Sequence, residues 1–156
     1  MAIEPGKPAP DFTLFDTGKN KVSLSGLKGK NVLLLFFPQA FTSTCTKELC
    51  AGRDDIRRYS NANAQVIGIS VDSVFTLKTY KEDQHDDFPL LSDFNKEVSA
   101  LYGSLYNEWI LGMKGVSKRS AFVIDKAGII RYAEVLENAG DIPDFNTINQ
   151  VLDSLD

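Results

Sequence analysis

The sequence predicts an α/β fold in which helices cover both faces of a central mixed β-sheet. Near-continuous apolar runs at residues 31–37 and 65–71 are typical of strands that are buried on both faces. Segments with helical periodicity follow these runs, and two pairs of short apolar segments flank turn-forming residues. Buried strands that alternate with helices need a helical layer on each face of their sheet, which defines the fold class.

The first half of the chain predicts a hairpin, a strand and a helix. Residues 12–14 and 22–24 alternate in polarity around the turn residues 16–20, which predicts a β-hairpin. The buried strand at 31–37 is closed by Pro38. Apolar residues spaced by three and four then predict a helix, namely Cys45, Leu49, Gly52, Ile56 and Tyr59.

The second half predicts two further strand–helix pairs, a hairpin and a last helix. Strands at 65–71 and 88–91 precede helices at 73–81 and 96–102, a second hairpin signal spans 120–135, and an amphipathic helix runs over 145–155. Residues 104–118 have no clear period. This order predicts a thioredoxin-like topology with an N-terminal β-hairpin extension, as a single domain over residues 1–156. The closing hairpin is expected to pair antiparallel to the earlier strands.

Composition excludes several classes of protein. A chain of 156 residues with 43% apolar residues buries a core without a disulfide or metal staple. The net charge of −4 argues against a nucleic-acid or anionic-membrane surface. Two cysteines and one histidine make neither a disulfide scaffold nor a His-rich metal site. We therefore expect chemistry, if any, at the thiols, with no metal or organic cofactor.

The composition of the N-terminal residues is not that expected of a secretory signal. It is polar and proline-rich, and it lacks a basic start followed by an apolar stretch. The longest apolar run, near residues 32–37, is far too short for a membrane span. We therefore expect a cytoplasmic protein, in a compartment that keeps thiols reduced.

Cys45 is the strongest candidate for chemistry. It falls in the first turn of the predicted helix, directly after a buried strand, where ligands bind in open α/β sheets. The free backbone N–H groups and the helix dipole at that position lower a thiol pKa and favour the thiolate. Thr42 lies three residues earlier, and Pro38 supplies a rigid bend and an apolar wall. The alternative interpretation of Cys45 is a small apolar core residue.

Two segments resemble a known family. The spacing Pro38-x-x-x-Thr42-x-x-Cys45 resembles the active-site motif of the peroxiredoxins, with every fixed position filled. The segment from Arg119 to Asp125 resembles the family strand whose arginine reaches the active cysteine. The resemblance covers the whole chain and implies reduction of hydrogen peroxide and organic hydroperoxides by Cys45. This reaction needs no metal or organic cofactor, because the oxidant is the substrate.

The resemblance also implies roles for the residues around the thiol. The Cys45 thiolate attacks a peroxide oxygen and becomes a sulfenic acid. The Thr42 hydroxyl, the backbone N–H groups of Thr44 and Cys45, and the Arg119 guanidinium would stabilise the charge on the departing oxygen. The alternative for Arg119 is a surface cation beside its lysine neighbour. Glu48 would hold an arginine in place, or it is simply a solvated helix charge.

The role of Cys50 decides how the sulfenic acid is removed. Its spacing from Cys45 resembles the PrxQ (bacterioferritin comigratory protein) group, in which both cysteines form an intramolecular disulfide that a thioredoxin-type dithiol reduces. Positions i and i+5 of a helix lie about 8–9 Å apart at Cα, but a disulfide spans about 4.4–6.8 Å. We therefore expect residues 42–52 to unfold locally on oxidation. The run from residue 41 to Cys45 instead resembles the AhpE-type one-cysteine group, with an external thiol reductant and an incidental Cys50.

Two rival functions keep the fold but change the chemistry. A disulfide oxidoreductase acting on protein thiols normally uses Cys-x-x-Cys, which is absent here. A binding module of the thioredoxin fold would carry inert thiols. Trp109, Tyr106 and Ile110 are expected to pack as apolar residues. The resemblance offers an alternative for Trp109, in which it lines the peroxide pocket or a subunit contact. His85 is expected in a solvated loop. The sequence leaves open whether the protein is a monomer or a homodimer.

Overall fold

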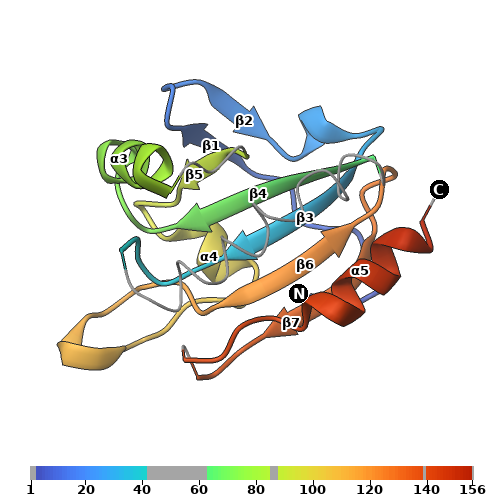
Figure 1. Ribbon diagram of the computed structural model, residues 1–156. Coiled ribbons are helices and arrows are strands. Elements are labelled where there is room, and N and C mark those ends of the chain that lie inside the picture. The colour runs from blue at the N-terminus through green and yellow to red at the C-terminus, as the bar shows by residue number, and fades with distance from the viewer. Residues whose placement is uncertain (1–2, 42–62, 85–87, 139, 156) are drawn as a thin grey trace.

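A seven-stranded mixed β-sheet forms the centre of the molecule (Figure 1). The computed structural model describes residues 3–41, 63–84, 88–138 and 140–155. The strand order is β2-β1-β5-β4-β3-β6-β7. The helix predicted over residues 45–59 and the loop around His85 lie outside the described residues.

The described elements follow the predicted order along the chain. The strands are β1 (Thr13–Asp16), β2 (Lys21–Ser23), β3 (Asn31–Phe36), β4 (Ala64–Ser70), β5 (Leu90–Ser92), β6 (Ser120–Ile124) and β7 (Ile130–Val135). The described helices are α3 (Val74–Gln84), α4 (Glu97–Leu101) and α5 (Phe145–Asp153), with short 3₁₀ turns η1 (Ser25–Leu27) and η2 (Ile110–Gly112).

The pairing of the strands confirms both predicted hairpins and the mixed sheet. β3 and β4 run parallel, and β4 and β5 also run parallel. β6 pairs antiparallel to β3, and β7 pairs antiparallel to β6, as expected of the closing hairpin. The N-terminal hairpin of β1 and β2 extends the sheet on the side of β5, because β1 pairs antiparallel with β5. β3 and β4 therefore end at the edge of the sheet where β6 begins (Figure 1).

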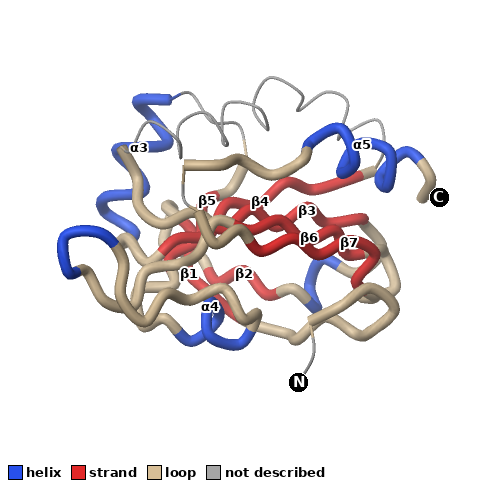
Figure 2. The backbone as a smooth tube through the Cα atoms, turned by 90° about the horizontal axis from the view of Figure 1, so that it is seen from below, coloured by secondary structure: helices blue, strands red, loops and turns tan. Residues whose placement is uncertain are grey.

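Successive side chains of β3 point into two separate cores. Leu33 and Leu35 pack with buried residues of α3 and α5, whereas Leu34 and Phe36 pack with Val98 of α4. Helices accordingly lie on both faces of the sheet, with α3 and α5 on one face and α4 on the other (Figure 2). A strand with both faces covered is largely apolar. All six residues of β3 are buried, and every one after Asn31 is apolar.

Two segments differ from the predictions. α4 begins at Glu97 because Lys96 adopts a left-handed backbone conformation, and the Asp93 carboxylate then accepts the N–H groups of Val98 and Ser99. In the segment without a clear period, Tyr106 and Trp109 stack on each other. The prediction that Ile110 packs as an apolar residue is wrong, because its side chain is exposed.

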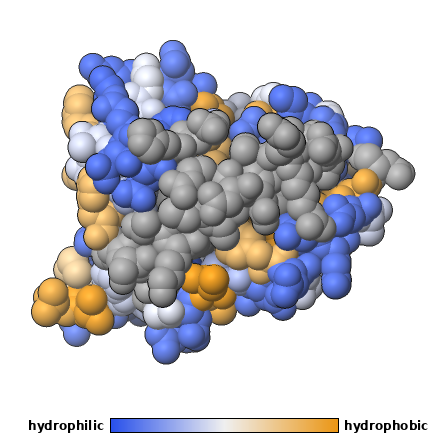
Figure 3. Space-filling view, in the orientation of Figure 1, coloured by the Kyte–Doolittle hydropathy of each residue, from blue (hydrophilic) through white to orange (hydrophobic). Residues whose placement is uncertain are grey.

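The segment around η2 projects from the molecule. Ile110 is 59% exposed and Leu111 is 91% exposed. Apolar residues gather at the corner of the surface where this segment projects (Figure 3). Short loops that project from a fold have too few neighbours to bury their side chains, whatever their polarity. Among the described helices, none has the length and apolar character to cross a membrane.

The turn between β6 and β7 depends on the charge of Asp125. Burial acts to raise the pKa of Asp125, but hydrogen bonds from the Ile129 and Ala127 amides and from Arg131 outweigh burial and lower it. A lowered pKa stabilises the fold above the pKa of the unfolded chain, and this stabilisation is lost as the pH falls through the folded pKa.

We expect Asp125→Asn to lower the free energy of unfolding by about 1–2 kcal/mol at neutral pH, because charge-assisted hydrogen bonds are lost. The difference should begin to shrink below about pH 4, the pKa of the unfolded carboxyl, and should be smallest below the lowered folded pKa, where the wild-type carboxyl is also neutral. Urea unfolding of both proteins across this range measures it. A difference that stays constant with pH would show that the charge of Asp125 contributes nothing.

Candidate active site

The candidate site lies where β3 and β4 end and β6 begins. The last ladder bond between the parallel strands runs from the Phe37 amide to the Ile69 carbonyl at 3.0 Å. On the other side of β3, Phe36 pairs with Ser120, the first residue of β6. The carboxyl ends of parallel strands are the edge at which open α/β sheets bind ligands. The chain continues from this edge toward Thr42 and Cys45.

Pro38 ends β3 at this edge. Its side chain is buried, as expected of an apolar wall. A proline has no backbone N–H. Successive N–H groups of a strand point to opposite sides, and the Phe37 amide points to β4, so Pro38 removes the next donor on the side of β6. The pairing of β3 with β6 therefore ends here for a covalent reason.

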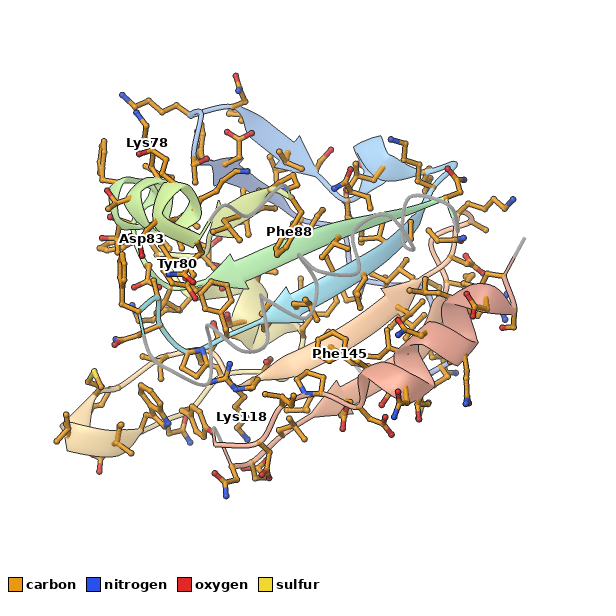
Figure 4. All side chains as sticks on the ribbon, in the orientation of Figure 1. Lys78, Tyr80, Asp83, Phe88, Lys118 and Phe145 are labelled. Carbon is orange, nitrogen blue, oxygen red and sulfur yellow. The ribbon has the colours of Figure 1, made fainter. Side chains whose placement is uncertain are left out.

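The residues after Pro38 make contacts with separate parts of the fold. The Gln39 amide nitrogen lies 3.3 Å from the sulfur of Met113, near the projecting η2 segment. The ring of Phe41 meets Tyr80 of α3 edge-on, with centroids 4.9 Å apart. Figure 4 places Tyr80 and Lys118 at this same end of the sheet, on α3 and just before β6.

Arg119 is the largest fully buried side chain among the described residues. It is 1% exposed, which contradicts the alternative of a surface cation. Lys118 beside it is the surface member of the pair, because its ammonium group bonds Glu137 at 2.8 Å. A guanidinium does not lose its proton in proteins, so the fold holds a fixed positive charge beside the end of β3.

The positive charge of Arg119 reaches at least one neighbouring group. Burial raises the pKa of Tyr106, and the charge of Glu137 raises it further, whereas the charge of Arg119 opposes both effects. The Tyr106 hydroxyl donates to the Glu137 carbonyl at 2.8 Å. The charge of the buried Arg119 guanidinium therefore acts on the Tyr106 hydroxyl, which precedes β6 in the chain.

Buried serines hold the backbone on both sides of Arg119. The hydroxyls of Ser104 and Ser120 are hydrogen-bonded to each other, and Ser104 also donates to the Lys118 carbonyl at 2.9 Å. Ser99 and Ser117 make a similar buried pair at 2.7 Å. Buried hydroxyls that are fully paired stiffen the structure around them. This network was not predicted, because single serines in a segment without a period give no signal.

Other contributors at this edge were also missed. Asp72 lies two residues beyond the end of β4, and its carboxylate accepts the Ala40 amide at 2.8 Å. A polar residue after a buried parallel strand is a signal that was available in the sequence. Of the predicted site residues, Pro38 and Arg119 lie at this end of the sheet, two residues after and one residue before the last described pair between β3 and β6. The others, Thr42, Thr44, Cys45, Glu48 and Cys50, lie outside the described residues.

The described part of the chain contains no cluster of three or more metal-ligating side chains. A cavity of about 360 Å³ lies at the opposite end of the sheet. It is lined by residues of η1 and of the β6–β7 turn, including Lys28 and Gly128. This cavity is therefore far from the candidate site. The candidate site is identified by the buried charge of Arg119 and by the end of β3.

Comparisons with known proteins agree with this geometry. Residues 5–133 match the model of the AhpC/TSA family. Alkyl hydroperoxide reductase E of Mycobacterium tuberculosis is 42% identical over 142 residues, which cover 89% of each chain. The mitochondrial thioredoxin-dependent peroxide reductase of Drosophila melanogaster is 33% identical, over 97% of this chain and 65% of that protein.

A solved structure has the same fold over almost its whole length. The crystal structure of peroxidoxin BcpB from Mycobacterium tuberculosis superposes with a TM-score of 0.87 at 31% identity, covering 99% of each chain. The sheet, the helices and the family match together confirm the thioredoxin-like fold and a cysteine-based peroxidase activity. The chain belongs to the AhpC/TSA family and is a peroxiredoxin.

Proposed function

We propose that Cys45 is the peroxidatic cysteine and that it reduces hydrogen peroxide and organic hydroperoxides. The carrying observation is the buried Arg119 guanidinium beside the end of β3, the strand that leads through Pro38 to Cys45. The name of the alkyl hydroperoxide reductase E relative supports organic hydroperoxides as substrates. Family membership supports the thiol as the reacting group.

The proposed step oxidises sulfur and reduces the peroxide. The Cys45 thiolate attacks one peroxide oxygen, so that an S–O bond forms and the O–O bond breaks. The departing oxygen leaves as water or an alcohol after it takes a proton, and the sulfur becomes a sulfenic acid. The Thr42 hydroxyl and the Thr44 and Cys45 backbone N–H groups stabilise the developing negative charge together with Arg119. Glu48 keeps a secondary role, in holding an arginine.

The second half of the cycle is proposed to run through Cys50. Its thiol condenses with the sulfenic acid, releasing water and forming an intramolecular disulfide. A thioredoxin-type dithiol then reduces this bond, and the name of the Drosophila relative supports that class of reductant. In the alternative, an external thiol reduces the sulfenic acid directly and Cys50 takes no part.

Replacing Cys50 by serine tests the resolving role. We expect Cys50→Ser to keep the fast oxidation of Cys45, because the attacking thiolate is unchanged, but to form no intramolecular disulfide and to overoxidise more readily. Intact mass after one equivalent of peroxide distinguishes the species. The wild type should lose two hydrogens without gaining oxygen. A wild-type product with a free Cys50 thiol and an oxidised Cys45 would overturn the intramolecular step.

Rapid mixing of the reduced wild-type protein with hydrogen peroxide and with an alkyl hydroperoxide tests the activity itself. A peroxidase consumes one equivalent in a single fast turnover. A disulfide oxidoreductase would consume protein disulfide instead, and a binding module with inert thiols would react no faster than a free thiol. We also propose that the protein acts in the cytoplasm as a single domain, as a monomer or homodimer, without metal or organic cofactor.

A further inference from the structure

The carboxylate of Asp72 ties the segment after β3 to the end of β4. Its Oδ2 accepts the Ala40 amide at 2.8 Å. Asp72 stands two residues beyond the end of β4, and Ala40 lies beyond the last backbone bond between β3 and β4. The side chain therefore links two adjacent parallel strands beyond their last backbone hydrogen bond.

Two serines hold Asp72 in this position. The Ser70 hydroxyl donates to the same Oδ2 at 2.7 Å and accepts the Asp72 amide at 3.1 Å. The Ser92 hydroxyl of β5 donates to the Asp72 carbonyl at 2.6 Å. Ser70 is fully buried. A carboxylate fixed on both its side chain and its backbone presents its oxygen to Ala40 in one orientation.

The residue after Ala40 adopts a conformation that needs support. Phe41 has φ 68°, in the left-handed region that is unfavourable for a residue with a Cβ. Such a conformation persists only where the surroundings determine it. The Ala40 amide is fixed by Asp72 on one side, and the Phe41 ring packs edge-on against buried Tyr80 on the other. These contacts hold Ala40 and Phe41, the last described residues before Thr42 in the sequence.

We propose that Asp72 is a positioning residue for peroxide reduction, acting through the Ala40 amide on the segment that carries Thr42 and Cys45. This role rests on the proposed function of Cys45. Asp72 takes no part in the chemical step. It holds the backbone two residues before Thr42, and small displacements of reacting groups cost large factors in rate.

The test compares Asp72→Ala with Asp72→Asn. The alanine variant removes the acceptor, so we expect the second-order rate constant for oxidation by hydrogen peroxide to fall about tenfold. The Ala40 amide should also lose its protection from hydrogen exchange. An asparagine oxygen still accepts the amide, so Asp72→Asn should keep that protection and a rate within about threefold of wild type. Ser70→Ala keeps the Asp72 carboxylate but removes one of the hydrogen bonds that hold it. Its rate constant should lie between those of Asp72→Ala and Asp72→Asn.

Asp125→Ala is the matched control. Asp125 also accepts two backbone N–H groups, but it lies at the opposite edge of the sheet, beyond the end of β6. Urea unfolding gives the stability of every variant, and Asp125→Ala should lose stability without losing rate. Rates of Asp72→Ala equal to wild type, or an equal loss in both Asp72 variants with Ala40 still protected, would overturn the proposal. If the wild type reduces no peroxide, or Cys45→Ser still reduces it, the proposed function itself is wrong, and the role of Asp72 falls with it.

Discussion

Cys45→Ser abolishes peroxide reduction by the reduced protein. We expect no consumption of hydrogen peroxide or alkyl hydroperoxide above the rate of a buffer containing a free thiol, because a serine hydroxyl is not ionised near neutral pH and is a far weaker nucleophile than a thiolate. Stopped-flow measurement of peroxide consumption, with protein in slight excess, gives the rate constants directly.

Cys50→Ser is the matched control for this result, because it removes the other thiol of the chain. The two variants should differ in the first step and not in stability. If Cys45→Ser oxidises at the wild-type rate while Cys50→Ser does not, the assignment of the two thiols is reversed. If neither variant loses rate, the reaction does not depend on a particular cysteine.

Arg119→Met has the second largest expected effect. Methionine fills much of the buried volume but carries no charge and no N–H donors. We expect the second-order rate constant with hydrogen peroxide to fall about 100-fold, the loss typical of removing one donor to a developing oxyanion. The pKa of the reactive thiol should also rise, because a fixed positive charge no longer favours the thiolate. The pH dependence of thiol alkylation measures this shift separately from the peroxide step.

Lys118→Met provides the control for Arg119→Met. Lys118 adjoins Arg119 in sequence, but its ammonium group pairs with the exposed Glu137 carboxylate. Removing it should leave the rate within about twofold, because surface ion pairs contribute little. Arg119→Lys keeps the charge but lacks the planar guanidinium with its several N–H donors. Its second-order rate constant should lie between those of the wild type and Arg119→Met. Equal losses for Lys118→Met and Arg119→Met would mean that net charge alone sets the rate.

The central sheet was predictable because its strands are buried on both faces. A strand covered by helices on each side has few polar positions, so β3 and β4 stand out as largely apolar segments. The hairpins were predictable from their turn residues, and α5 from its stripe of apolar side chains. The projecting segment around Ile110 was not, because apolar composition does not reveal whether a loop finds neighbours to pack against.

By itself, the sequence determined the fold class, the edge of the sheet where chemistry is expected, and the cysteines available for it. Local spacing and apolar runs carry that information. Only the tertiary structure decided that Arg119 is buried, since the same residue pair in a loop also fits an exposed position. It also decided that Asp72 reaches Ala40. Both depend on contacts between segments far apart in the chain, and no local pattern encodes which strand ends will be neighbours.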